Sequence, residues 1–389
     1  MIISTILFFA GMVLMIPVFF FTVQIFAAVF LYKPSAAISK LGNRPKIVVL
    51  IPAHNESIVI SETIKSIIPQ LVALDRLVVV ADNCIDDTAL IAKKLGAEVV
   101  ERTSSSNKGK GFALDFGLQY IKNTPADVVI MIDADCCVSD NSIENLAYAC
   151  VTHQRPIQSL NLMYANANPN LKAIVAQFAW LVKNKVRPLG LKALSMPCQL
   201  MGTGMAFLWD DIVYSKLASG HIVEDMKLGI DFSRMRKAPI FLEEALVTST
   251  FPITVEATTS QRTRWEHGHL SVILNEVPRL LFDAVKTKNI MLFALACDLL
   301  IPPLAVLVFL CTAYFILSLL LLNQPAIKIA LILITALLGS VLMAWAWFGR
   351  NVISFKQLCY APIYALMKIP LYIRFFINRQ VEWVRSKRD

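Results

Sequence analysis

Three long apolar runs stand toward the two ends of the chain. Residues 1–32 contain no charged side chain, and uncharged runs recur at Leu299–Ile327 and Ile329–Gly349. Each run contains at least the roughly 20 apolar residues that a helix needs to cross a bilayer. The pattern therefore predicts one crossing before the middle of the chain and two after it. The turn between the last two is expected at Asn323, Gln324, Pro325 and Lys328.

Basic residues predict the orientation of these crossings. Lys33, Lys40 and Arg44 follow the first run, and Arg350 and Lys356 follow the last. Because positive residues favour the cytoplasmic side, both positions are expected to lie in the cytoplasm. The first run lacks the positive start and the small-residue end of a cleaved signal peptide, so we expect it to remain as an anchor.

Two further features concern the membrane boundary. The apolar segment Phe355–Ile377 is interrupted by Lys356, Lys368, Arg374 and two prolines. We therefore expect amphipathic helices in the membrane interface, followed by a basic tail, instead of a further crossing. Asp298 lies near the mouth of the second crossing, where an interfacial position is expected and a functional role is the alternative.

Short apolar runs alternate with amphipathic stretches in the middle of the chain. The β-branched runs predict strands at 46–51, 77–81, 98–101 and 128–132. Helical periodicity predicts helices between them, at 57–68, 86–95 and 111–122. Alternating strands and helices indicate an α/β fold with a mainly parallel sheet, and in such sheets ligands bind at the carboxyl ends of the strands.

Composition narrows the class of protein. Hydrophobic residues make up 56% of the 389 residues and charged residues 17%, whereas ordinary soluble domains have about 45–50% and about 25%. A fully soluble enzyme is therefore excluded. The net charge of +9 is concentrated in residues 350–389, which favours membrane lipid as a partner and argues against nucleic acid. Eight cysteines without a CxxC pair predict reduced thiols.

Polar residues follow three of the predicted strands. The segments after them are Pro52-Ala53-His54-Asn55-Glu56, Asp82-Asn83-Cys84-Ile85-Asp86-Asp87 and Asp133-Ala134-Asp135. None matches the glycine-rich fingerprints of dinucleotide-binding or P-loop proteins, so hydride transfer and P-loop ATP hydrolysis are excluded. The sequence predicts that these three segments meet at one edge of the sheet.

The acidic residues at this edge suggest a site for a cation and a nucleotide. Asp133 and Asp135 flank one small residue and could hold Mg²⁺ or Mn²⁺ together with substrate phosphates. A simple turn or a helix cap is the alternative. Asp82 could accept the imide N–H of a uracil ring, whereas Asp86 and Asp87 are expected to cap a helix.

Lys108 and Lys110 precede a predicted helix whose N-terminus favours anions, so this loop is either a diphosphate contact or merely solvated.

These motifs occur together in a known family. Ile51–Glu56, the Asp82 segment, Asp133–Asp135, Glu224-Asp225 and Gln261–Trp265 resemble, in order and spacing, the motifs of membrane-bound family 2 glycosyltransferases. That group includes cellulose, chitin and hyaluronan synthases and bacterial exopolysaccharide transferases. The resemblance covers about residues 45–290 and implies a GT-A-like nucleotide-sugar-binding domain flanked by transmembrane helices.

The strand tips and the resemblance together define a predicted site. Donor-binding residues are expected to be Pro52, Ala53, Asn55, Glu56, Asp82, Lys108, Asp133 and Arg264. Acceptor-binding residues are expected to be Gly202, Thr203, Gly204, Glu224, Gln261 and Trp265. The resemblance implies that Asp225 is the general base and that Asp133 and Asp135 hold the metal. A helix cap at Asp225, a membrane anchor at Trp265 and two solvated histidines, His267 and His269, are the ordinary alternatives.

The implied reaction is inverting transfer of a sugar from a UDP-sugar to a growing glycan or a lipid-linked acceptor at the cytoplasmic membrane, in polysaccharide synthesis. Polysaccharide-export or biosynthesis proteins would be its partners. Val223 stands where a Thr often precedes the Glu-Asp pair, and there are few crossings, so continuous chain extrusion is in doubt. Transfer of one sugar to a polyprenyl-linked acceptor is an alternative, as is a non-catalytic nucleotide-binding subunit.

The predicted organisation has four parts. Residues 1–44 form a transmembrane helix and linker, and 45–288 form the cytoplasmic domain. Two transmembrane helices occupy 289–349, and 350–389 form interfacial helices and the basic tail.

Overall fold

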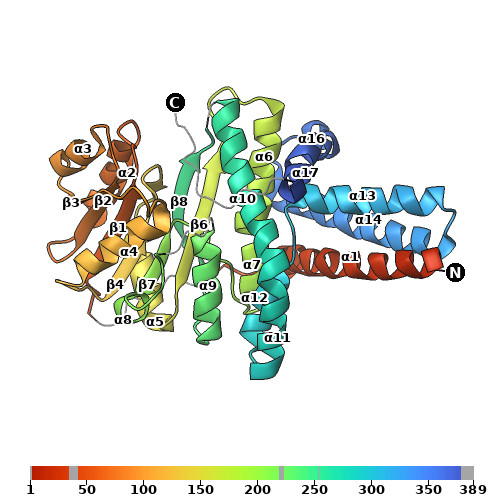
Figure 1. Cartoon of the computed structure of the whole chain (residues 1–389), viewed down its shortest axis with the longest axis horizontal. Coiled ribbons are helices and arrows are strands. Elements are labelled where there is room, and N and C mark those ends of the chain that lie inside the picture. Colours follow the sequence, from red (N-terminus) through yellow and green to blue (C-terminus); the bar gives the residue numbers. More distant parts are fainter. Residues whose placement is uncertain (1, 35–42, 219–222, 253, 378–389) are drawn as a thin grey trace.

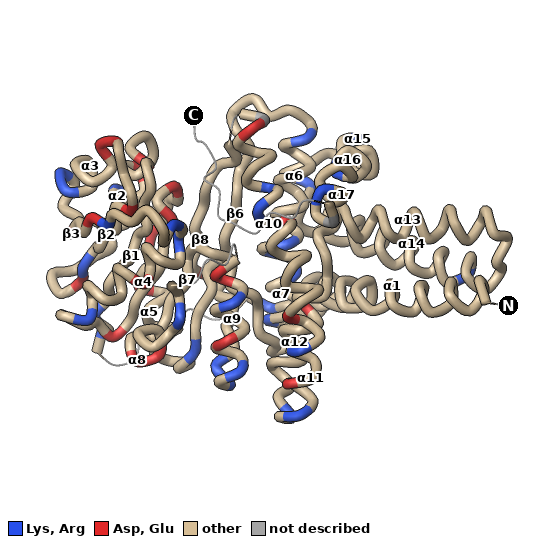
Figure 2. The backbone as a smooth tube through the Cα atoms, viewed as in Figure 1, with Lys and Arg blue, Asp and Glu red and all other residues tan. Residues whose placement is uncertain are grey.

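The computed structural model describes residues 2–34, 43–218, 223–252 and 254–377 (Figure 1). A sheet with helices on both faces forms one end of the molecule. Three helices project together from the other end: α1 (Ile2–Phe26), α13 (Leu304–Leu320) and α14 (Gln324–Ala344). Charged residues concentrate on the sheet body and on the helices next to it, while the projecting helices are almost uncharged (Figure 2).

The sheet has eight strands in the order β3-β2-β1-β4-β7-β6-β8-β5. Their bounds are β1 Ile47–Ala53, β2 Arg76–Asp82, β3 Glu98–Arg102, β4 Val128–Met131, β5 Cys137–Val138, β6 Ile157–Tyr164, β7 Met205–Leu208 and β8 Ile240–Thr250. The four predicted strands are β1 to β4, and they pair in parallel. β7 pairs antiparallel with β4 and β6, which makes the sheet mixed but mostly parallel.

Helices cover both faces of this sheet because its strands are apolar on both sides. On β1, Ile47, Val49 and Ile51 belong to a core with α2 (Ile60–Ile67), α3 (Thr88–Lys94) and α5 (Ser142–His153). Val48 and Leu50 belong to the opposite core with α4 and α9. Those helices span Lys110–Ile121 and Glu224–Arg234. The alternation follows from the two-residue period of a strand.

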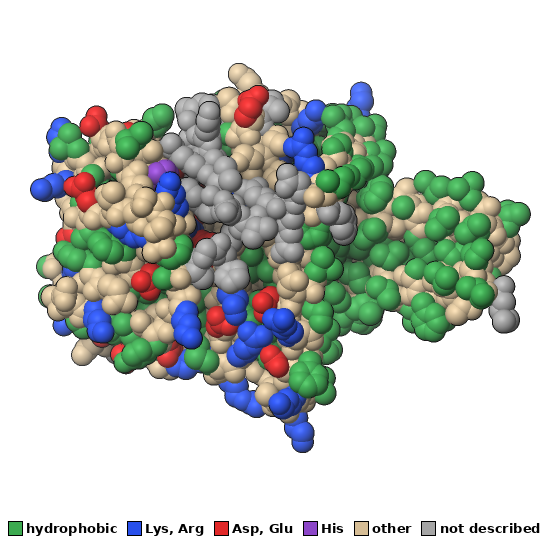
Figure 3. Space-filling view, in the orientation of Figure 1, with side chains coloured by type: hydrophobic (Ala, Val, Ile, Leu, Met, Phe, Trp, Pro, Cys, Tyr) green, Lys and Arg blue, Asp and Glu red, His purple; other side chains and the backbone are tan. Residues whose placement is uncertain are grey.

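Within the described residues, two helices are long and apolar enough to cross a membrane. One is α1 with its π-helical extension, Ile2–Leu31, and the other is α14 with its extension, Gln324–Gly349. A third crossing would be the bent pair α12 (Ile290–Leu299) and α13, whose axes differ by 71°. One sequence expectation was wrong here. Gln324, Pro325 and Lys328 lie inside α14 instead of in the turn before it. Apolar side chains cover the visible face of the projecting helices (Figure 3).

A layer of helices lies between the sheet and the projecting helices (Figure 1). It contains α6 (Leu171–Leu181), a π-helical turn (Val182–Val186), α7 (Arg187–Ala193), α10 (Val255–Asn275) and α11 (Val277–Thr287). The other helices are the short α8 (Trp209–Ile212), α15 (Phe355–Leu358), α16 (Ala361–Met367) and α17 (Ile369–Ile377). The last three replace a further crossing, and their position at a membrane interface stays a prediction.

Helix α7 packs directly on α1. A Cβ atom added to Gly190 would lie 1.9 Å from the backbone oxygen of Gln24. Only glycine therefore fits at this crossing. The first membrane helix and the layer of helices beneath the sheet consequently form one packed unit.

Candidate active site

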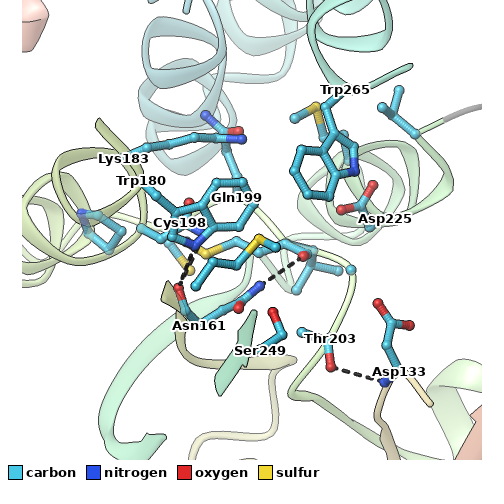
Figure 4. Close-up of a pocket in the computed structure, with 18 of the residues that line it drawn as sticks. Asp133, Asn161, Trp180, Lys183, Cys198, Gln199, Thr203, Asp225, Ser249 and Trp265 are labelled. Carbon is cyan, nitrogen blue, oxygen red and sulfur yellow. Dashed lines mark hydrogen bonds between the residues drawn. The ribbon is translucent and has the colours of Figure 1, made fainter. Parts of the chain in front are cut away.

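One cavity brings together most of the predicted site. It opens where the carboxyl end of β4 meets the start of α9, the turn before β7 and the face of α10. The predicted residues that line it are Asp133, Asp135, Gly202, Thr203, Glu224, Asp225, Gln261, Arg264 and Trp265. Figure 4 shows Asp225 between Trp265 and Asp133. Segments more than one hundred residues apart in the sequence therefore supply one site.

Lys110 is the central cation at the strand-tip end of the cavity. Its Nζ lies 2.6 Å from Asp133 Oδ1 and 3.9 Å from Glu224 Oε1, and it donates to Gly202 O at 2.7 Å. Burial opposes the charge on Lys110, but Asp133 and Glu224 outweigh that effect, so its pKa is raised. Lys108, the lysine chosen from the sequence, is exposed and does not line the cavity. The Lys110 ammonium, at the first position of α4, occupies the place expected for Lys108.

The turn before β7 shapes the wall next to Asp133. Gly202 and Gly204 have φ angles of 88° and 66°, a region that favours glycine. This conformation places Thr203 Oγ1 where it accepts the backbone N–H of Asp133 at 3.0 Å. Gly204 itself is outside the cavity lining, so its contribution is to the turn.

Two neighbouring acids begin α9. Burial raises the pKa of Glu224 to about 7, with Lys110 acting in the opposite direction and Asp225 in the same one. Burial also raises the pKa of Asp225, although Lys110 and Lys183 favour its charged form. A carboxyl group whose pKa is raised toward neutrality is suited to proton transfer.

Helix α10 places the Gln-x-x-Arg-Trp motif along the cavity. Gln261, Arg264 and Trp265 are spaced by three and four residues, which puts them on one face of a helix. Thr254 begins the helix by accepting the backbone N–H of Ala257.

The first-strand residues and Asp82 lie apart from this cavity. Asn55 and Glu56 border a separate hollow with Ile85 and Asp86. The Asp86 carboxylate accepts the backbone N–H groups of Ser57 and Thr88, and hydrogen bonds hold its pKa near 2 against the effect of burial. Asp86 therefore joins the loop at Ser57 to the start of α3, whereas Asp87, the N-cap residue of α3, makes no side-chain capping hydrogen bond, so the expectation that both residues cap a helix is only partly met. Pro52 and Ala53 end β1 and line neither the cavity nor the hollow.

The Asp82 carboxylate is nearly buried and is held by two neighbours. Its Oδ1 accepts Arg102 Nη1 at 2.5 Å and Asn83 Nδ2 at 3.0 Å. Arg102 therefore compensates its charge. Sequence reasoning had no means of finding this partner on the next strand.

The opposite end of the cavity is built by helices and was mostly missed. Trp180 of α6 lies 5.0 Å from Trp265, measured between ring centroids, and its Nε1 donates to Asn161 O. Arg187 and Gln199 also line the cavity. Isolated aromatic and cationic residues on helices carry no spacing signal, and only packing reveals their role.

Asp298 is buried, contrary to the interfacial position expected for it. Arg187 Nη2 donates to its Oδ1 at 2.7 Å and Gln199 Nε2 to its Oδ2 at 2.7 Å. Gln24 of α1 donates to Oδ1 at 2.8 Å and accepts Arg187 Nε at 2.8 Å. A buried carboxylate requires such partners. This network ties α1 to the cavity, which Arg187, Gln199 and Asp298 line.

The two histidines of α10 are also buried, so the expectation of solvated side chains was wrong. His267 pairs through Nε2 with Leu371 O, and His269 pairs through Nε2 with Leu299 O, each at 3.0 Å. Burial lowers the pKa of His269 to about 3. The histidines fix α10 against α12 and α17 and do not line the cavity.

Fold and cavity together define an α/β protein with a charged, substrate-sized site next to apolar helices. The sequence profile described as "Glycosyltransferase like family 2" matches residues 45–268, and the chain belongs to this family. The family is one of glycosyltransferases. The expected GT-A-like fold and the expected membership of glycosyltransferase family 2 are both confirmed, whereas the membrane-bound, synthase-like subtype stays a prediction.

Two similar proteins are named as glycosyltransferases, which agrees with the assignment to this family. The chain is 26% identical over 269 residues to the probable glycosyltransferase YdaM of Bacillus subtilis, covering 63% of this chain and 60% of that protein. It is 29% identical over 202 residues to 4,4'-diaponeurosporenoate glycosyltransferase of Staphylococcus haemolyticus, covering 48% and 51%. The matches thus span between half and two thirds of these relatives.

A solved structure shows the same fold over nearly the whole chain. The mannosyltransferase PcManGT of Pyrobaculum calidifontis, described in complex with GDP-Man and Mn²⁺, has a TM-score of 0.56. The comparison covers 96% of this chain and 100% of the mannosyltransferase at 13% identity. The likeness therefore extends to the helices outside the family profile.

Proposed function

We propose that this protein is an inverting, metal-dependent hexosyltransferase that uses a UDP-sugar at the cytoplasmic face of the cell membrane. The observation that carries the proposal is the single cavity between Asp133 and Trp265, with Asp225 between them. Its acceptor is a growing glycan or a lipid-linked molecule, in exopolysaccharide synthesis. The apolar helices next to the cavity support an acceptor that reaches the site from the membrane.

The residues at the strand-tip end fit a divalent cation shared with the donor. Asp133 and Asp135 both line the cavity, and carboxylate oxygens are the donors that Mg²⁺ and Mn²⁺ prefer. No group of three or more His, Cys, Asp or Glu arranged for a metal occurs in the described part of the chain. Two carboxylates with diphosphate oxygens completing the shell match this arrangement. The cation would neutralise charge on the leaving diphosphate.

The residues of the cavity then define the transfer. Asp225 takes the proton of the attacking acceptor hydroxyl, and that oxygen bonds to the anomeric carbon as the bond to the diphosphate breaks. Lys110 and Arg264 stabilise the negative charge that builds on the departing UDP. One displacement without a covalent enzyme intermediate inverts the anomeric carbon.

The nucleobase is proposed to lie near the tips of β1 and β2. Pro52, Ala53, Asn55 and Glu56 would border it, and Asp82 would accept the uracil imide N–H. The hydrogen bonds to the Asp82 carboxylate that involve described residues all reach Oδ1. Its Oδ2 is therefore available to the base.

A second candidate keeps the chemistry and changes the product. Transfer of one sugar to a polyprenyl-linked acceptor is favoured by the modest membrane part, in which the described residues give two or at most three crossings. Such a bundle leaves little wall for a polymer channel in one protomer. A sizing gel of the product distinguishes the two candidates, since only a polymerase makes a ladder of lengths.

The test is release of UDP from a panel of UDP-sugars by the purified protein with Mn²⁺ or Mg²⁺ and membrane lipids. We expect Asp225→Asn to lower the turnover by roughly 10²–10⁴-fold, the range for loss of a general base. The control is Asp231→Asn on the same helix, which loses only surface ion pairs with Lys227 and Arg234. Absence of UDP release from every donor, or unchanged turnover in Asp225→Asn, would refute the proposal.

A further inference from the structure

The helix-built end of the cavity contains a cation without an anionic partner. Lys183 lies in the π-helical turn between α6 and α7 and lines the cavity. Its Nζ is 5.6 Å from the centroid of Trp180, and it makes no hydrogen bond or ion pair with any residue that the structure describes. Figure 4 shows its side chain extending past Trp180 and Gln199.

The acids that act on Lys183 are Asp225, Asp298 and Glu266, and each has another partner or role. Glu266 pairs with Lys368. Asp298 is saturated by Arg187, Gln24 and Gln199. Asp225 acts as the base in the proposed reaction. Burial lowers the pKa of Lys183, with Asp225 and Asp298 favouring its charge and Arg187 opposing it. Burying the charge of Lys183 away from water costs free energy. An anionic group of a bound ligand would offset this cost by pairing with the ammonium group.

Two hydrogen-bond acceptors beside Lys183 also lack a donor. Asn161 Oδ1 and Asn184 Oδ1 are buried, and both residues line the same cavity. Neither oxygen has a hydrogen-bond partner among the residues that the structure describes. Their amide nitrogens are already used, since Asn184 Nδ2 donates to Asn161 O at 3.2 Å and Asn161 Nδ2 to Met201 O at 3.4 Å. A buried acceptor without a donor costs free energy. We therefore expect the two amide oxygens to accept hydrogen bonds from hydroxyl groups of a ligand.

We propose that Lys183, Asn161 and Asn184 form an acceptor subsite for a phosphate group attached to a hydroxyl-bearing polyol, of the glycerol phosphate type. The inference rests on the proposed function and specifies the acceptor for the same cavity. Lysine binds phosphate as a point charge, the amide oxygens bind hydroxyl groups, and Trp180 and Trp265 supply an apolar wall. The group can belong to a lipid headgroup or to a soluble phosphate ester.

Binding to the full-length protein tests the subsite directly. The probes are sn-glycerol 1-phosphate in solution, and vesicles of phosphatidylglycerol compared with vesicles of phosphatidylcholine. We expect Lys183→Met to weaken binding of glycerol phosphate or of phosphatidylglycerol by about tenfold or more, the effect of one charge-assisted hydrogen bond. Lys183→Arg should retain most of the affinity. Lys185→Met is the matched control, because Lys185 belongs to the same turn but does not line the cavity.

A second variant tests the hydroxyl part. Asn184→Leu should weaken binding of glycerol phosphate but leave binding of inorganic phosphate unchanged, since inorganic phosphate has no polyol. If phosphatidylglycerol vesicles bind in a way that depends on Lys183 and glycerol phosphate does not, the phosphate group belongs to a lipid headgroup. Lysine-dependent binding of both probes would identify a site that also takes the soluble ester.

Binding of UDP with Mn²⁺, measured on the same samples, separates the two levels of the proposal. UDP should bind wild type and Lys183→Met equally. If wild type fails to bind UDP, the proposed function falls, whatever Lys183 does. If UDP binds but both probes bind wild type and Lys183→Met alike, the subsite is overturned and the proposed function stands.

Discussion

The two ends of the cavity are built in different ways. At the strand-tip end, Asp133 and Lys110 stand directly after a strand or at the start of a helix. At the helix-built end, Trp180 lies on α6 and Arg187 on α7, which packs on α1. The first arrangement is local and follows from the geometry of a parallel sheet. The second exists only when distant helices meet, so the two ends should respond differently to substitution.

The largest effect on activity in this comparison is expected at Lys110. Lys110→Met removes the cation that faces Asp133 and Glu224 and leaves the two carboxylates without this ammonium partner. We expect kcat/KM for the donor to fall by about 10²-fold or more, the scale of a lost preorganised charge. Lys108→Met is the control, because Lys108 is exposed outside the cavity. Equal loss in both variants would mean that the structure has selected the wrong lysine.

In contrast to Lys110→Met, Arg187→Met should lower the stability of the protein more than it weakens donor binding. It leaves Asp298 buried with only Gln24 and Gln199 as donors. Breaking a buried pair costs about 3–5 kcal/mol. Thermal unfolding in detergent measures this loss, with Arg236→Met as the control because that side chain binds only the Thr287 carbonyl at the surface. An unchanged midpoint would show that the network does not join the membrane helix to the cavity.

A smaller effect is expected in the pH profile of kcat/KM, because Glu224 and Asp225 at the start of α9 have raised pKa values. Burial raises the pKa of Glu224 to about 7 and also raises that of Asp225. Because the base, Asp225, must be unprotonated and burial raises its pKa, kcat/KM should begin to decline at a higher pH than an ordinary Asp would cause. Glu224→Gln removes a neighbouring negative charge and should move this decline to lower pH. A profile of kcat/KM between pH 5 and pH 9 would contradict this if the two curves coincided.

The same shift predicts how stability depends on pH. For a carboxyl whose folded pKa is raised, the cost of burying the charge is absent below the unfolded value and grows as pH rises toward the folded one. Wild type should therefore lose stability between about pH 4.3, the usual Glu value, and about pH 7. In Glu224→Gln this part of the pH dependence of the unfolding midpoint should disappear.

The smallest effect is expected at Trp180. Trp180→Phe keeps an aromatic wall beside Trp265 but loses the hydrogen bond to Asn161 O. One neutral hydrogen bond contributes about 0.5–1.5 kcal/mol, so the acceptor KM should rise by roughly two- to tenfold while the donor KM stays constant. A change in the donor KM would show that the two ends of the cavity are coupled.

The sequence was sufficient to predict the first four strands of the sheet and the acidic residues at the strand-tip end of the cavity. β1 to β4 are short runs of β-branched residues, and the acids follow them in fixed positions. β6 and β8 were not predicted, since their mixed polar and apolar residues gave no distinct period. Lys108 and Lys110 differ by two positions in one loop, and only the start of α4 decides which ammonium reaches Asp133.

The helix-built end could not be predicted because its partners are remote. Asp298 and Arg187 are separated by 111 residues, and Gln24 is 274 residues from Asp298. No spacing rule connects them, and a lone carboxylate near an apolar run resembles an interfacial residue. The same holds for His267 and His269, whose carbonyl partners belong to other helices.

The contact of Gly190 with the backbone of Gln24 has a practical consequence for protein production. Engineers often delete an N-terminal anchor to obtain a water-soluble catalyst. Here that deletion would remove the polar group that braces Arg187 and Asp298 and would open a slot along α7. The shortened protein would lose a support of Arg187 and Asp298, two side chains that line the cavity.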